Sequence, residues 1–117
     1  MANIDLDIRT AKLQGKDKLQ THTTRTMKWY DTIVFHNWDP EQSLAVIIET
    51  EPDRPGPVLC QADGTNGPMN FSVPPRQSSA AYKICRGYSG TYFKYTAQIG
   101  PGAYSDAEDP IIIIERK

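Results

Sequence analysis

The residues best suited to chemistry are two histidines, two cysteines and short acidic segments. His22 and His36 belong to different segments, and no third ligand accompanies them, so we expect polar surface or half-buried side chains. The segments "DGTNG" (63–67) and "SDAEDP" (105–110) carry oxygen ligands that suit calcium, but both lack the ligand spacing of an EF-hand loop. We therefore expect solvated turns there, with no metal and no other cofactor.

Cys60 and Cys85 are too few for a disulfide framework and do not form a C-x-x-C motif. The simplest interpretation is two buried thiols, and the alternative is a single bridge between neighbouring strands; the sequence does not decide whether they pair. Cys85 falls in a strand pattern rather than at a helix N-terminus, where a thiolate would be stabilised. The chain also lacks a G-x-S-x-G elbow, so we expect no enzyme.

Size and charge narrow the classes of partner. The chain has 117 residues and a formal net charge of −1, which predicts one domain without a basic surface for nucleic acid or anionic membranes. No apolar segment is long enough to span a membrane, and the first residues lack the apolar core of a secretion signal. We expect a soluble protein that is cytoplasmic or exported without a classical signal peptide, although an earlier removal of a signal peptide remains open.

Alternating apolar and polar residues predict strands throughout the chain. We expect about seven to nine strands, the clearest at 4–8, 31–38, 44–49, 57–61, 69–73, 80–85, 91–99 and 109–117. The strands at 31–38 and 44–49 should form a central pair, and those at 80–85 and 91–99 a hairpin around "RGYSG". This pattern indicates an all-β sandwich or barrel.

The domain begins with a less regular segment. After the first strand, residues 10–28 are polar and should be loop with at most one short strand near 20–25. We therefore divide the single domain, 1–117, into an N-terminal strand plus polar loop (1–28) and a core sandwich (29–117).

Alternation within residues 31–38 predicts which face each side chain takes. Phe35 and Asn37 should share one face, and His36 and Trp38 the other. Asp39 can then cap one helical turn, or a type I turn, within the corner "DPEQ".

The segments "DTIVFHNWDPEQSLAVII", "NFSVPP", "GTYFKYTAQI" and "PIIIIE" follow one another in an order that resembles the cupredoxins, which are Greek-key β-sandwiches. The resemblance implies a cupredoxin-like fold in which Asn37 braces the loops by hydrogen bonds. It also implies an absent copper site, because Ser43 and Leu44 occupy the region of the first histidine ligand. The loop "AQIGPGAYSDAEDP" has no cysteine, histidine or methionine for the remaining ligands.

Aromatic residues are the best candidates for a binding surface, since Tyr and Trp at strand ends offer flat contact area. Those that exceed the needs of a core are Trp29, Tyr30, Trp38, Tyr88, Tyr92, Tyr95 and Tyr104. The resemblance implies that Trp38, Tyr88 and Tyr104 meet at one end of the sandwich and form the site.

Three functions follow as hypotheses. The first is a non-catalytic binding or assembly module, in which an edge strand or aromatic end contacts a protein partner or a second copy of the chain. The alternatives are a carbohydrate-binding module (a lectin) and a metal-binding or redox protein.

Overall fold

The computed structural model describes residues 3–13, 16–20, 24–50, 57–86, 88, 91–100, 103–104 and 111–115. This part of the chain is built from strands, and no helix in it is long and apolar enough to cross a membrane. The strands are β1 (Asn3–Leu13), β2 (Lys16–Gln20), β3 (Thr24–Lys28), β4 (Thr32–Asn37), β5 (Leu44–Thr50), β6 (Leu59–Cys60), β7 (Asn70–Val73), β8 (Tyr82–Ile84), β9 (Tyr92–Ile99), β10 (Ala103–Tyr104) and β11 (Ile111–Glu115).

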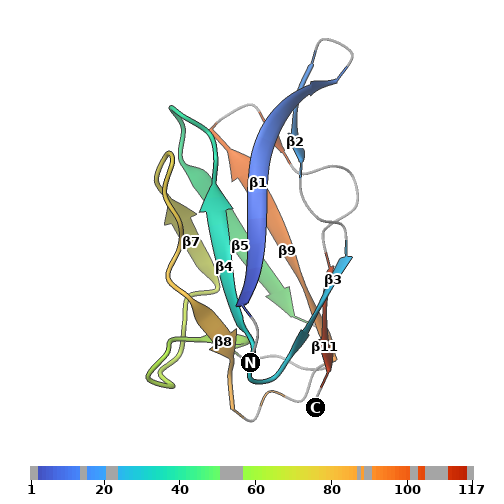
Figure 1. Cartoon of the computed structure of the whole chain (residues 1–117), viewed down its shortest axis with the longest axis vertical. Coiled ribbons are helices and arrows are strands. Elements are labelled where there is room, and N and C mark those ends of the chain that lie inside the picture. Colours follow the sequence, from blue (N-terminus) through green and yellow to red (C-terminus); the bar gives the residue numbers. More distant parts are fainter. Residues whose placement is uncertain are drawn as a thin grey trace.

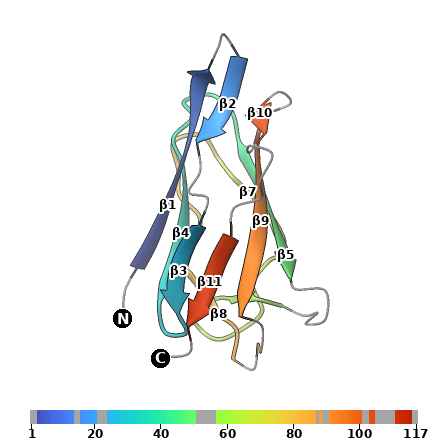
Figure 2. The same cartoon turned by 90° about the vertical axis from the view of Figure 1, so that its right-hand side faces the viewer.

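The strands form two sheets that pack face to face as a β-sandwich (Figures 1 and 2). The first sheet has the order β2-β1-β4-β8-β6, and the second has the order β3-β11-β9-β5-β7 with β10 paired to the end of β9. Both sheets are mixed, because β1 runs parallel to β4 and β3 runs parallel to β11. The remaining pairs are antiparallel.

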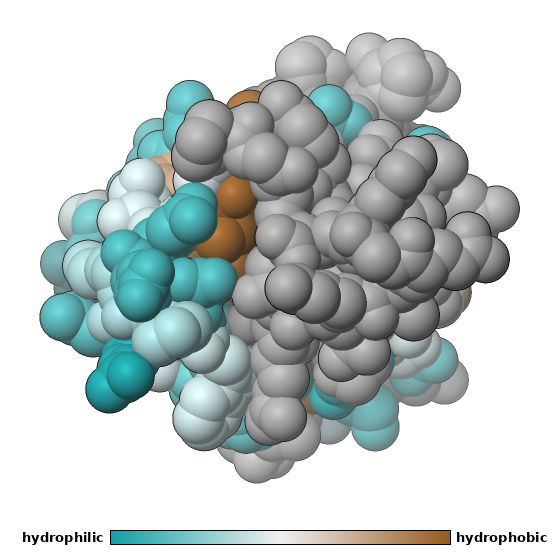
Figure 3. Space-filling model, turned by 90° about the horizontal axis from the view of Figure 1, so that it is seen from above, coloured by the Kyte–Doolittle hydropathy of each residue, from teal (hydrophilic) through white to brown (hydrophobic). Residues whose placement is uncertain are grey.

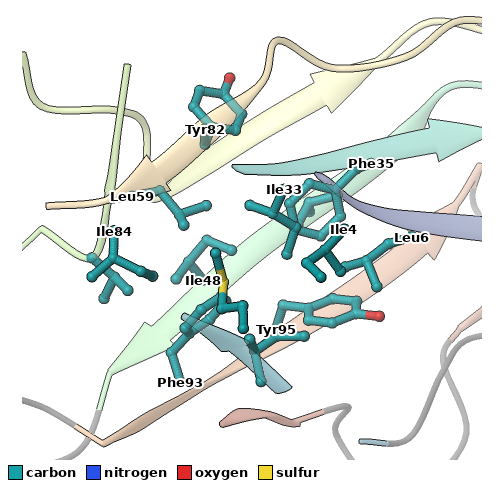
Figure 4. Packing of buried hydrophobic residues seen from close by; sticks show 14 of the residues in the cluster. Ile4, Leu6, Ile33, Phe35, Ile48, Leu59, Tyr82, Ile84, Phe93 and Tyr95 are labelled. Carbon is teal, nitrogen blue, oxygen red and sulfur yellow. The ribbon is translucent and has the colours of Figure 1, made fainter. Parts of the chain in front are cut away.

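One hydrophobic core lies between the sheets, and Figure 4 shows how the side chains meet there. The strict alternation of β9 places Phe93, Tyr95, Ala97 and Ile99 inward, as period-two strands require. Phe35 of the first sheet crosses the core to pack edge-on against Tyr95, with ring centroids 5.4 Å apart. In β9, alternate residues of the strand thus form the face that packs on the core.

Several expectations about pairing were wrong. The strands β8 and β9 do not form a hairpin, because β8 pairs with β4 and β6 while β9 pairs with β5 and β11 in the other sheet. Likewise, β4 and β5 lie in different sheets rather than as a central pair. Alternation identifies a strand but says little about its neighbour, because pairing is decided by packing between distant segments.

The N-terminal segment is also more regular than expected. Residues 10–28 contain the end of β1, all of β2 and all of β3, where we expected loop with one short strand. β2 pairs with β1 and β3 pairs with β11 through their backbones, so these segments form strands although their polar side chains do not indicate them. The described residues accordingly form eleven strand segments rather than seven to nine, although β6 and β10 contain two residues each.

The hydroxyl of Tyr95 is a weak point of this core. It is buried without a hydrogen-bond partner, and burial raises its pKa well above the usual value. We expect Tyr95→Phe to increase the free energy of unfolding by about 1 kcal/mol, because it removes an unsatisfied polar group and keeps the ring. Urea denaturation measures the change. A loss of stability would instead show that the hydroxyl has a partner in solution.

Candidate functional site

The turn between β3 and β4 presents two aromatic side chains at one end of the sandwich, the lower end in Figure 1. The backbone N–H of Asp31 donates to the carbonyl of Lys28 over 2.9 Å, which closes a β-turn with Trp29 and Tyr30 at its tip. The buried carboxylate of Asp31 also accepts the N–H of Lys28. Trp29 and Tyr30 remain 39% and 47% exposed, so the turn places flat apolar surface at the protein surface.

A disulfide lies beside this turn. Cys60 of β6 is bonded to Cys85, which directly follows β8, and this corrects the simpler expectation of two buried thiols. The antiparallel pairing of β6 with β8 brings the two cysteines to a Cα separation of 4.9 Å. That separation lies within the range a disulfide requires. The bridge between neighbouring strands, which the sequence left open, is the one that forms.

The chain after β6 folds back over that strand and brings polar groups to the same end. The N–H of Gly67 donates to the carbonyl of Leu59, and a side chain at Gly67 would lie 2.6 Å from that oxygen. Asp63 in this turn accepts hydrogen bonds from the backbone and hydroxyl of Thr65, which hold its pKa below the usual value. Lys83 lies near enough to add to this effect and donates to the carbonyl of Ala62.

These elements enclose a groove with a volume of about 570 Å³. Trp29 and Tyr30 line it together with the disulfide, Asp63 and residues 83–86. It combines exposed aromatic surface with one carboxylate, the ammonium of Lys83 and the guanidinium of Arg86. The groove can therefore hold a ligand that has both a flat apolar face and several hydrogen-bonding groups.

The residues predicted from the sequence do not come together there. Trp38 is 53% exposed but follows the far end of β4, and Tyr104 pairs through its backbone with Gln98 at that same end. The side chain of Tyr104 lies outside the described residues. Tyr88 lies beyond the opposite end of β4, where it is 6% exposed and its hydroxyl donates to the carbonyl of Tyr92. The structure thus separates Tyr88 from the other two.

Asn37 is buried and connects three segments at the Trp38 end. Its side-chain N–H groups donate to the carbonyls of Gln42, Val73 and Pro74 at 2.9 to 3.2 Å, and its oxygen accepts the N–H of Asp39. Asp39 in turn accepts two backbone N–H groups of the corner. The coloured atoms of this end in Figure 3 are mainly hydrophilic, with a small hydrophobic area near the centre of the view.

Metal-ligating residues do not gather in the described part of the chain, where no three His, Cys, Asp or Glu side chains lie close enough to hold an ion. His22 and the acidic segment 105–110 lie outside the described residues. His36 points away from the core, as expected, and contacts Asp5 and Ser78.

No known protein-family model matches the sequence, and no curated protein is significantly similar to it. The chain is thus a two-sheet, all-β protein with an aromatic groove at one end. Trp29 and Tyr30 are among the surplus aromatic residues of the sequence, but they were not part of the predicted site. The local signal for them is their position directly before Asp31, a residue typical of turns.

Proposed function

We propose that the chain is a non-catalytic binding module that holds a carbohydrate in the groove beside Trp29 and Tyr30. The observation that carries the proposal is the pair of exposed aromatic side chains on the rim of a hollow of about 570 Å³. Pockets for small ligands measure roughly 300–1,000 Å³, so the groove has the size for one or two sugar rings.

The chemistry of the rim supports a sugar. A pyranose has a face of C–H groups, which packs on a flat aromatic ring, and a rim of hydroxyls, which need hydrogen-bond partners. Asp63 supplies an ionised acceptor, while Lys83 and Arg86 supply donors. The aromatic rings can therefore pack on the C–H face of a sugar while the neighbouring charged groups bind its hydroxyls.

We also propose a Greek-key, cupredoxin-like arrangement for the sandwich, without copper chemistry. Two features support it: Asn37 at the end of β4 holds the neighbouring loops through its amide, and Ser43 and Leu44 stand in the region of the first histidine ligand. A titration with copper, followed by absorption in the visible range, tests the expected absence of a copper site. A thiolate-to-copper band would contradict it.

Binding can be tested by tryptophan fluorescence, because the chain has two tryptophans, one at each end of the sandwich. A glycan array selects the sugar, and titrations then compare Trp38→Phe, which reports Trp29 alone, with Trp29→Phe, which reports Trp38 alone. We expect the sugar to change the emission of the Trp38→Phe variant only. Trp29→Ala should weaken binding about 30-fold, as the loss of a central aromatic contact does.

The matched control is Trp38→Ala, which removes the more exposed tryptophan at the opposite end and should leave the affinity unchanged. If the sugar instead changes the emission of the Trp29→Phe variant, the site lies near Trp38, as the sequence alone predicted. If no glycan binds, the carbohydrate proposal is wrong.

A protein partner, or a second copy of the chain, is the second candidate. Ile47 of β5 and Ile113 of β11 are 45% and 40% exposed on the outer face of the second sheet. A further hollow of about 460 Å³ between β9 and β11 adjoins Ile113. Exposed apolar side chains of this kind favour the docking of another protein surface. The glycan experiment separates the two candidates, because docking on this face requires neither a sugar nor Trp29.

A further inference from the structure

The outer face of the first sheet carries a chain of hydrogen bonds that ends on a serine. Thr32 donates its hydroxyl to the side-chain oxygen of Asn3 over 2.7 Å, and Asn3 donates to the carboxylate of Asp5 over 2.8 Å. His36 contacts the same carboxylate oxygen through Nε2 at 2.8 Å, and its Nδ1 contacts the hydroxyl of Ser78. These side chains come from β1, β4 and the connection before β8.

The carboxylate of Asp5 determines which group donates in each hydrogen bond of this network. An ionised carboxylate can only accept, so Nε2 of His36 must carry the proton that points to Asp5. In the neutral imidazole, Nδ1 is then an acceptor, and the hydroxyl of Ser78 must donate to it. Hydrogen bonds from His36 and Asn3 lower the pKa of Asp5, which keeps it ionised. The serine hydroxyl is therefore bonded to a general base whose other nitrogen faces an anion.

Strand geometry explains why these groups meet. His36 and Ser78 form an antiparallel bridge flanked by the bonds from Asn37 N–H to Gln77 O and from Ser79 N–H to Phe35 O. In such a pair the two residues exchange no hydrogen bond, so their side chains approach closely on one face. The N–H of Ser78 points away from β4 for the same reason.

We infer that Ser78 is a reactive serine, activated by His36 and positioned through Asp5, that accepts an acyl group from activated esters. Oγ of Ser78 forms a bond to the acyl carbon, and the bond from that carbon to the leaving oxygen breaks. The proton of Oγ passes to Nδ1 of His36 and then to the leaving oxygen. This inference goes beyond the proposed function, because Ser78 lies near the Trp38 end of β4 and outside the aromatic groove.

The reaction can be followed with p-nitrophenyl acetate, by intact mass and by peptide mapping of the acetylated residues. We expect Ser78 to be acetylated at least about 10-fold faster than Ser72, an exposed serine on β7, and His36→Gln to slow acetylation of Ser78 about 100-fold. Free imidazole should restore part of the rate in His36→Ala. The variant Ser72→Ala is the matched control and should leave labelling of Ser78 unchanged.

The role of Asp5 needs a separate readout, because it acts through His36. Nitrogen chemical shifts of the imidazole should show a proton on Nε2 in the native chain and a mixture of tautomers in Asp5→Ala. Circular dichroism verifies that each variant remains folded. Equal labelling of Ser78 and Ser72, or an unchanged rate in a folded His36→Gln variant, would overturn the inference.

Discussion

Replacing both Cys60 and Cys85 with alanine is expected to lower the free energy of unfolding by about 3 to 4 kcal/mol. The bridge closes a loop of 25 residues between β6 and β8, and opening such a loop gives the unfolded chain more conformational freedom. The strand β6 has only two residues and ends its sheet, so only a short backbone pairing joins it to β8 besides the disulfide. Urea denaturation of the variant and the native chain measures the difference.

Reduction provides the control for this prediction. A reducing agent should lower the stability of the native chain to nearly that of the double variant, and it should leave the variant unchanged. Because the disulfide lines the groove, both treatments should also weaken sugar binding. Unchanged stability on reduction would mean that the cysteines are not paired in solution.

The second large loss of stability is expected when Asn37 is replaced by alanine. Alanine at this position removes the donor shared by three buried or half-buried carbonyls and the acceptor for Asp39, so we expect a loss of about 3 kcal/mol in the free energy of unfolding. The cost is large because the carbonyl of Val73 is buried, where water cannot easily replace the amide. Thermal or urea denaturation measures it.

Two comparisons make this result specific. Asn70→Ala changes an exposed asparagine on β7 and should alter stability by less than about 0.5 kcal/mol. Asn37→Asp keeps the oxygen that accepts from Asp39 but replaces the donor by a second acceptor, so it should also destabilise the fold. If Asn37→Ala is as mild as Asn70→Ala, the amide does not hold the corner together.

The sequence predicted the fold class because burial follows local alternation. In the eight-residue strand β9 every second residue is buried, including Tyr95, which was predicted from the sequence to be among the aromatic residues that exceed the needs of a core. Pairing could not be predicted in the same way. The strand β8 was assigned to β9 because they are close in sequence, whereas its backbone pairs with β4, about fifty residues earlier.

The candidate site was harder to predict because it depends on which aromatic residues remain at the surface. Trp29 and Tyr88 both lie near strand ends in the sequence, yet the first is well exposed and the second is buried. Their difference arises from the turn closed by Asp31 and from the bond of Tyr88 to the Tyr92 carbonyl. Neither contact can be recognised from the pattern of neighbouring residues in the sequence. The approach of Ser78 to His36 is equally hidden, since 42 residues separate them.

The parallel pairing of β3 with β11 has a consequence for biosynthesis. It joins residues 24–28 to residues 111–115, so the second sheet cannot be completed until residue 115 has left the ribosome. Until then β3 lacks its backbone partner, and the apolar side chains that β11 covers remain open to solvent. The sandwich should therefore fold only after β11 has been synthesised.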